Sequence, residues 1–397
     1  MSLYSKIIDR QKLTVAWDRV RKNKPAAGVD NITFEQFDSD IREQIEKLYS
    51  RLNEHTYSAM PVKEVTLYKG EKARQIALYC MQDKVVQQSL ALELTKIYDN
   101  DFTTQTYAYR PNKSALEAIQ RITEAIINEK YEYYIKLDIH DFFGSMEWRQ
   151  LENILRFNIK EDDVIDLIRT NSCGLRLDID SGDLAERRIG VYQGSGIAPI
   201  LSNLYLMDFD KWMCHIPNTF FIRYSDDMIA LGRSHDEMIS LLQQMTKKLS
   251  DVGLKINEKK SSVGRVAEGF SFLGYAFDSE GKSVPKKAEE NLQERLETMW
   301  LTSADLSIED KLKKVLEIVG GWEQYFKDER EIGSIFEFSA LVYANKGLPE
   351  RFLELIGKRS AFTNIYRDIT GFLTELWKAE GFNSLELFEY LSVKQHR

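Results

Sequence analysis

Two adjacent aspartates, Asp226 and Asp227, lie between two short apolar runs, FFIR and MIAL. Neighbouring carboxylates repel each other unless a cation neutralises them. Aspartate is also a common turn residue, so the pair alone is weak evidence for a site. The flanking runs are apolar enough to form strands in the core of a sheet. We therefore expect the pair at the turn of a central hairpin.

A third carboxylate, Asp138, ends a run of aromatic and β-branched residues, 133–138, that is typical of a strand. If this strand pairs beside the hairpin, Asp138 lies close to Asp226. Carboxylates at one sheet edge suit Mg²⁺, which prefers octahedral oxygen coordination and keeps substrate phosphate as a partner. Two ions held this way would activate an attacking 3′-oxygen and stabilise a pyrophosphate leaving group. The pattern predicts phosphoryl transfer by positioning and charge neutralisation.

The elements that would position these carboxylates alternate between strands and helices. Period-2 and helical patterns predict strands at 62–67, 74–78, 133–138, 220–224, 228–231, near 263 and at 270–276, a hairpin over 175–189, and helices at 84–97, 114–128, 147–158, 199–213 and 236–253. From Lys286 onward the periodicity is helical almost throughout. This order predicts an α+β catalytic unit with a helical appendage.

Composition excludes several classes of protein. Of 397 residues, 43% are hydrophobic and 29% charged, which is typical of a soluble globular protein. The three cysteines stand far apart, and no CxxC or HExxH run exists, so we expect neither a zinc site nor a disulfide framework. Residues 1–10 are polar, and no apolar run approaches the roughly 18 residues needed to span a bilayer. A cytoplasmic protein without a membrane partner is expected.

The net charge of −8 argues against broad binding of nucleic acid, because phosphate binding depends on clustered Lys and Arg. Basic residues nevertheless cluster at 19–24, 69–74, 259–260 and 282–287. Each cluster by itself is also compatible with an ordinary solvated face. The acidic total fits a narrow channel, or one preferred RNA partner, better than indiscriminate binding of duplex.

Several motifs resemble, in order, those of reverse transcriptases, most closely those of bacterial group II introns and their relatives. The similar segments are 16–37 (the amino-terminal extension), 67–88 (the fingers hairpin), 107–114 (YAYRPNKS), 138–143 (DIHDFF), 190–206 (the glutamine-glycine loop), 222–231 (IRYSDDMIAL), 253–261 (GLKINEKKS), 269–275 (the primer-gripping strands) and 320–327 (GGWEQYFK). The resemblance implies a right-hand polymerase with fingers, a palm built on an antiparallel sheet, an all-helical thumb and a C-terminal helical tail. The implied boundaries are 1–132 for the N-terminal extension and fingers, 133–285 for the palm, and 286–397 for the thumb and tail.

The resemblance also implies roles for individual residues. Two Mg²⁺ ions, with Mn²⁺ as a substitute, are expected at Asp138, Asp226, Asp227 and Ile139. Lys260 fits the place of a lysine that protonates the leaving pyrophosphate, although a lysine after a hairpin is otherwise an ordinary surface residue. With the three aspartates, Lys260 completes the expected catalytic set.

Substrate contacts follow from the same resemblance. They are Lys69, Lys72, Arg74, Arg110, Phe143, Gln193, Gly194 and Tyr224. Phe143 takes the place of the gate that excludes a ribose 2′-hydroxyl, and Gln193 with Gly194 takes the place of the loop beside the templating pair. Ordinary alternatives stay open, because Phe143 is equally compatible with a core position and Gln193 with a helix cap. Lys72 is the alternative to Lys69 at the triphosphate, and Arg110 is expected at template or nucleotide.

The chain departs from intron-encoded enzymes at identifiable places. Gly144 follows Phe143 where those enzymes have an aspartate, and residues 191–199 read VYQGSGIAP where a sequence closer to TPQGGIISP is usual. No basic DNA-binding module or Cys/His-rich nuclease segment follows the thumb-like stretch, and the elements expected of retron enzymes are missing.

We therefore expect a free-standing enzyme that copies a structured non-coding RNA in antiphage defence, using a DNA or RNA primer and deoxynucleoside triphosphates. The alternatives are template-independent or protein-primed DNA synthesis, as in abortive-infection relatives, and a non-catalytic, maturase-like RNA-binding protein. The sequence does not specify the oligomeric state.

Overall fold

The computed structural model describes residues 2–69, 72–177, 184–186 and 189–303, with scattered positions between 305 and 326. The chain divides into two compact units, Met1–Gly269 and a second that begins at Phe270. The predicted helical tail, 330–397, and the turn of the predicted hairpin over 175–189 lie outside the described residues. None of the described helices is long and apolar enough to cross a membrane.

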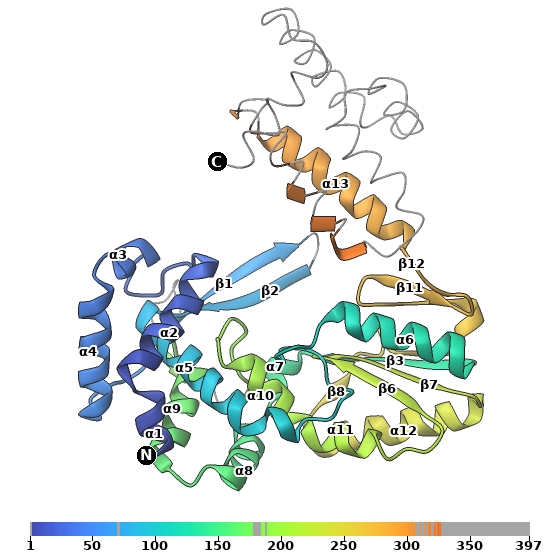
Figure 1. Cartoon of the computed structure of the whole chain (residues 1–397), viewed down its shortest axis with the longest axis horizontal. Helices are drawn as coiled ribbons and strands as arrows, with labels where there is room; N and C mark the ends of the chain where they lie inside the picture. Colours follow the sequence, from blue (N-terminus) through green and yellow to red (C-terminus); the bar gives the residue numbers. More distant parts are fainter. Residues whose placement is uncertain are drawn as a thin grey trace, which may run out of the picture. The chain divides into compact units, whose positions relative to one another are not determined.

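The first unit combines helices with two sheets (Figure 1). Its helices are α1 (Leu3–Ile7), α2 (Arg10–Val20), α3 (Phe34–Ser39), α4 (Ile41–Asn53), α5 (Met81–Tyr98), α6 (Ala115–Glu129), α7 (Phe142–Ser145), α8 (Trp148–Asn158), α9 (Asp162–Cys173), α10 (Ala198–Tyr205), α11 (Met207–Met213) and α12 (His235–Asp251). Its strands are β1 (Val62–Lys69), β2 (Lys72–Leu78), β3 (Tyr133–His140), β4 (Leu175–Leu177), β5 (Leu184–Glu186), β6 (Phe220–Tyr224), β7 (Asp227–Gly232), β8 (Lys255–Ile256) and β9 (Ser262–Arg265). The described part of the second unit contains β10 (Phe270–Phe272), β11 (Tyr275–Asp278), β12 (Gly281–Ser283) and α13 (Lys286–Thr302).

The central sheet of the first unit has the order β6-β7-β3-β8, and β9 also pairs with β3. Every pairing in it is antiparallel. Ile135 and Leu137 of β3 are fully buried on the face that α12 covers, while α6 packs against β6 on the other side (Figure 1). Side-chain caps start both helices, since the hydroxyls of Ser114 and Ser234 accept hydrogen bonds from main-chain N–H groups in the first turns.

The second sheet has the order β2-β1-β4-β5, in which β1 and β4 are parallel and the other pairs antiparallel. Its inner side carries a small cluster of Val62, Ala77, Tyr79 and Tyr192. Because Tyr192 belongs to the glutamine-glycine loop, this cluster ties the loop to the hairpin of β1 and β2.

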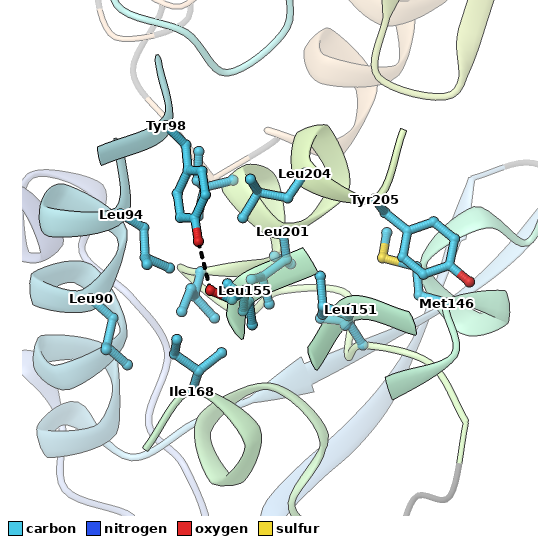
Figure 2. Close-up of a cluster of buried hydrophobic side chains, with 14 of the residues drawn as sticks. Leu90, Leu94, Tyr98, Met146, Leu151, Leu155, Ile168, Leu201, Leu204 and Tyr205 are labelled. Atoms are coloured by element: carbon cyan, nitrogen blue, oxygen red, sulfur yellow. Dashed lines mark hydrogen bonds between the residues drawn. The ribbon is translucent and has the colours of Figure 1, made fainter. Parts of the chain in front are cut away.

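Helices α5, α8, α9 and α10 share a buried apolar core (Figure 2). Leucines 90 and 94 of α5 face Leu151 and Leu155 of α8, together with side chains of α9 and α10. The hydroxyl of Tyr98 donates a hydrogen bond to the carbonyl oxygen of Leu155 at 3.0 Å, so the one polar atom of this ring has a partner. The core fixes α10, which begins directly after the loop.

The α+β prediction is confirmed, and so are the predicted strands of both hairpins and the helices α5, α6, α8 and α12. One helix was expected over 199–213, but it breaks at Leu206 into α10 and α11. The apolar periodicity continues across the break, which is why the sequence does not reveal it. The sequence also did not predict α7, α9 or the two-residue strand β8.

Candidate active site

The sheet brings the predicted carboxylates to one place. Asp138 near the end of β3 lies directly opposite Asp227, the first residue of β7. Tyr224 and Asp227 close the hairpin, so Ser225 and Asp226 alone form its turn. Asp138 was predicted to lie close to Asp226; the register of β3 with β7 makes the next residue, Asp227, its direct partner across the sheet.

The pKa values of the two hairpin carboxylates, Asp226 and Asp227, are raised, so nearby positive charge does not fully compensate their burial and repulsion. Burial, and then the charges of Asp226 and Asp138, raises the pKa of Asp227 from 3.8 to about 6. Burial is also the main cause of the raised pKa of Asp226, and the charge of Asp138 adds to it. The ammonium groups of Lys136 and Lys260 oppose the rise at Asp227 without cancelling it. Both carboxyl groups therefore favour any arrangement that brings a cation closer.

Asp138 is 3% exposed and is surrounded by the loop that follows β8. Its Oδ2 accepts a hydrogen bond from Nζ of Lys260 at 2.6 Å. Its carbonyl oxygen accepts from the main-chain N–H of Asn257 at 2.7 Å, and its own N–H donates to the hydroxyl of Ser261 at 3.2 Å. The other carboxylate oxygen, Oδ1, is buried without a hydrogen-bond partner. A buried charged oxygen without a partner is rare and calls for a ligand.

These residues fit a hard divalent cation. Among the described residues, no group of three or more His, Cys, Asp or Glu side chains is arranged to hold a metal ion. In this structure Lys260 bonds to one carboxylate oxygen of Asp138. The partnerless Oδ1, and the repulsion and burial that raise the pKa of Asp226 and Asp227, nevertheless fit an all-oxygen site for a cation such as Mg²⁺. Ile139, the fourth expected ligand, is a buried residue of β3 whose only oxygen is its main-chain carbonyl.

Phe143, the expected sugar gate, lies on the short helix α7 just after β3. Its ring is partly exposed and contacts Phe142, with 5.4 Å between ring centroids. Its carbonyl oxygen accepts a hydrogen bond from the N–H of Val191 at 2.7 Å, which holds α7 against the glutamine-glycine loop. Two close contacts make this possible: a Cβ at Gly190 would overlap the carbonyl of Gly144, and a Cβ at Gly144 would overlap the Asp141 carboxylate. With the Asp141 carboxylate in this place, position 144 has no room for the aspartate side chain that intron-encoded enzymes carry there.

Gln193 and Gly194 lie against the edge of β2. The carbonyl of Gln193 accepts a hydrogen bond from the N–H of Ala77 at 2.8 Å. Gly194 has φ of 103°, and a Cβ there would lie 2.7 Å from the carbonyl oxygen of Ala77. Only glycine fits this approach. The loop therefore contacts the β1–β2 hairpin through Gln193 and α7 through Val191.

The expected basic contacts divide into two groups. Lys69 and Lys72 form the last backbone pair of the β1–β2 hairpin, but their side chains lie outside what the structure describes, and Arg74 is exposed on β2. Arg110 turns inward instead of toward a substrate. Its guanidinium donates to the carboxylate of Asp99 at 2.8 Å and to main-chain carbonyl oxygens of the same segment, with 10% of the side chain exposed. We therefore do not include it among the substrate contacts.

Tyr224 and a set of buried polar residues complete the site. The Tyr224 ring is half-buried, which raises the pKa of its hydroxyl. Beside it, Arg223 is fully buried and pairs with Asp210, a contact that the sequence analysis missed. The signal was present, since an arginine inside an apolar strand needs a buried partner. Tyr109 was missed as well; it is half exposed and contacts the turn at Ser225.

Comparisons with known proteins agree with this geometry. The chain is 24% identical over 372 residues to the putative COX1/OXI3 intron 2 protein of Saccharomyces cerevisiae, covering 77% of this chain and 43% of that protein. It is 23% identical to the protein YkfC of Escherichia coli, covering 64% and 76%. It is 24% identical to LtrA, a group II intron-encoded protein of Lactococcus lactis, covering 55% and 36%. The predicted resemblance to group II intron enzymes is thus confirmed, although the chain spans less than half of the yeast protein and of LtrA.

Among solved structures, apo telomerase from Candida tropicalis matches 71% of this chain and 61% of its own, with a TM-score of 0.48 and 13% identity. The sequence profile named "Reverse transcriptase (RNA-dependent DNA polymerase)" matches residues 67–277, which is just over half of the chain. The motifs predict a right-hand polymerase, and on this match the chain belongs to the reverse transcriptase family and has that fold.

Proposed function

We propose that this protein is an RNA-directed DNA polymerase that extends a primer by phosphoryl transfer at Asp138, Asp226 and Asp227. One observation carries the proposal. Two strands deliver three carboxylates to one sheet edge, where Oδ1 of Asp138 has no partner and the pKa of Asp227 is raised to about 6. Buried carboxylates with raised pKa values are typical of functional sites. Membership of the reverse transcriptase family indicates DNA synthesis as the reaction.

The three aspartates would hold the divalent ions of this reaction. Bound Mg²⁺ supplies neutralisation of the triphosphate and activation of the 3′-hydroxyl. Lys260 holds a proton next to the site, with its ammonium anchored on Asp138 at 2.6 Å. That place suits a donor to the leaving pyrophosphate.

Other residues bind and select. The hydrogen bond from Val191 fixes the main chain of Phe143, and the partly exposed ring supports its proposed role as the gate against a ribose 2′-hydroxyl. The loop of Gln193 and Gly194 contacts the β1–β2 hairpin at Ala77, and its neighbour Val191 contacts Phe143, which supports a proposed contact with the templating pair. We propose Arg74 and, on the same hairpin, Lys69 or Lys72 as triphosphate contacts. The fingers, palm and thumb boundaries predicted from the sequence belong to this proposal.

The proposal extends to the template. We propose a structured non-coding RNA copied in the cytoplasm as part of antiphage defence, with a DNA or RNA primer. The net charge of −8 supports it, because such a chain binds arbitrary duplex poorly and depends on specific contacts. Sequencing of nucleic acid co-purified with the wild type and with an Asp226→Ala/Asp227→Ala variant tests this extension. One abundant RNA in both samples, with complementary DNA only in the wild type, is expected; heterogeneous RNA would refute it.

Primer extension tests the reaction itself. The full chain is mixed with an RNA template, a labelled DNA primer, deoxynucleoside triphosphates and Mg²⁺. Asp138→Asn and Asp226→Asn are expected to reduce extension to background, whereas Glu268→Gln, which removes an exposed carboxylate, keeps wild-type extension. Extension without template would favour template-independent synthesis, and product covalently bound to protein would favour protein priming. Full extension by Asp226→Asn would exclude this site.

A further inference from the structure

The turn that carries the two aspartates has a strained backbone at Ser225. This residue has φ of 61°, whereas Asp226 does not have a positive φ. In a two-residue hairpin turn with a positive φ at the first central residue only, glycine is the usual occupant. A serine there persists only where its surroundings hold it. Ser225 is also 5% exposed, so the holding groups belong to the protein.

The guanidinium of Arg223 is the main holding group. Its Nη1 donates to the carbonyl oxygen of Ser225 at 3.0 Å. Its Nε donates to Oδ1 of Asp210 at 2.7 Å, and its Nη2 donates to Oδ2 of the same carboxylate. The side chains of Arg223 and Asp210 are 0% and 1% exposed. The guanidinium of arginine is planar and carries several N–H donors in fixed directions, so it can bridge a carboxylate and a carbonyl oxygen at the same time. The Ser225 hydroxyl adds a second hold by donating to the hydroxyl of Tyr109 at 3.3 Å.

The pair is itself fixed from several sides. Asp210 of α11 accepts a hydrogen bond from the hydroxyl of Thr106 at 2.7 Å. Asn203 of α10 accepts from Nη1 of Arg223 at 3.2 Å and donates to the carbonyl oxygen of Ala108 at 2.8 Å. The main chain of Arg223 bonds the segment 105–107 through both its N–H and its C=O, each at 3.0 Å. Through Arg223, the turn is therefore held by hydrogen bonds to α10, to α11 and to the segment 105–107.

We propose that Arg223 is a positioning residue for catalysis. By holding the Ser225 carbonyl it fixes the peptide plane from which Asp226 projects, and so the direction of that carboxylate toward the reacting atoms. Arg223 itself contacts neither substrate nor metal in this role. A buried ion pair is a weak source of stability, and apolar residues often replace it without loss. The bond to Ser225 is what an apolar replacement would not supply. The inference rests on the proposed role of Asp226.

Three variants of the full chain test the proposal. Arg223→Met/Asp210→Leu removes both buried charges together and so leaves neither unpaired. Arg223→Lys keeps the charge but has no fork to span Asp210 and Ser225. Leu155→Ala, in the helical core and outside the site, serves as a control for loss of stability alone. Melting temperature, template–primer affinity and single-turnover incorporation of one deoxynucleotide are measured, which separates the rate constant from the nucleotide Kd.

We expect both Arg223 variants to fold and to bind template–primer as the wild type does. Their incorporation rate constant should fall on the order of 10- to 100-fold while the nucleotide Kd changes by less than about threefold, because a displaced carboxylate impairs the reaction and not binding. Leu155→Ala should melt earlier but keep its rate constant. A rate constant within about twofold of wild type in either folded Arg223 variant would overturn the proposal.

Folding of the variants is itself informative. If the double variant does not fold, Arg223→Lys decides by the same criterion. If neither folds while Leu155→Ala does, the pair serves folding and the proposal is wrong. Failure of the proposed function gives a different result, since Asp226→Asn would then keep the wild-type rate.

Discussion

Replacing Asp227 by asparagine should stabilise the metal-free protein. The pKa of this carboxyl rises from 3.8 to about 6 on folding. At about 1.4 kcal/mol per pH unit, ionisation of the buried group costs the folded state about 3 kcal/mol. Asparagine keeps the shape of the side chain and removes the charge. Part of this cost is repulsion from the neighbouring carboxylates Asp226 and Asp138, which asparagine removes.

The pH dependence gives the prediction its sign. Because the folded pKa lies above the unfolded one, the wild type is relatively most stable below pH 4 and loses stability as pH rises through about 6. Asp227→Asn should therefore exceed the wild type by about 3 kcal/mol at pH 8 and by about half of that at pH 5. Urea unfolding followed by circular dichroism, with a chelator present, measures the difference.

Two comparisons make the test specific. Glu268→Gln, which removes an exposed carboxylate, should show no such pH-dependent gain. Adding Mg²⁺ should stabilise the wild type more than Asp227→Asn, because a ligand that binds the folded state stabilises it and the variant has lost a ligand oxygen. A variant as stable as wild type at pH 8, or a gain that stays constant from pH 5 to 8, would refute the electrostatic reasoning.

Three further substitutions follow from the geometry. Phe143→Ala should permit incorporation of ribonucleotides; unchanged selectivity between ribo- and deoxynucleoside triphosphates in primer extension would contradict the gate. Gly190→Ala should destabilise the protein by at least about 2 kcal/mol, because φ is 88° and the new Cβ would overlap the carbonyl of Gly144; urea unfolding checks this. Arg110→Met should cost about 2 kcal/mol or more through loss of its bonds to the Asp99 segment, and leave the KM for nucleotide unchanged; a large rise in KM would restore a substrate role.

The strands and carboxylates of the site were predictable because their signals are local. Short apolar runs bounded by turn residues place the β6–β7 hairpin, and a strand that ends in aspartate places β3. The register between β3 and β7 could not be predicted from local signals. That Asp138 faces Asp227 depends on how β3 pairs with β7, which no single segment encodes.

Buried polar residues account for much of what the sequence analysis missed. In α9, Asn171 and Ser172 are fully buried polar residues of the last turn, so the apolar pattern of the helix is confined to 164–168. Arg110 was expected at template or nucleotide and Arg223 was given no role, yet the guanidinium groups of both turn inward to carboxylates of the same protein, Asp99 and Asp210. Hydrogen bonding in the folded chain, and not local propensity, decides the direction of such side chains.

The carboxylate cluster links the stability of the fold to its chemistry. Lys136 and Lys260 both lower the pKa of Asp227, but burial and the charges of Asp226 and Asp138 raise it more, to about 6. The chain therefore carries too little positive charge near these carboxylates to satisfy them, and Oδ1 of Asp138 still has no partner. If Lys260 were placed to neutralise the cluster fully, a divalent ion would have to displace it at a matching cost. The incomplete neutralisation costs stability in the metal-free protein, and under the proposed function that cost would become binding energy for the divalent cation.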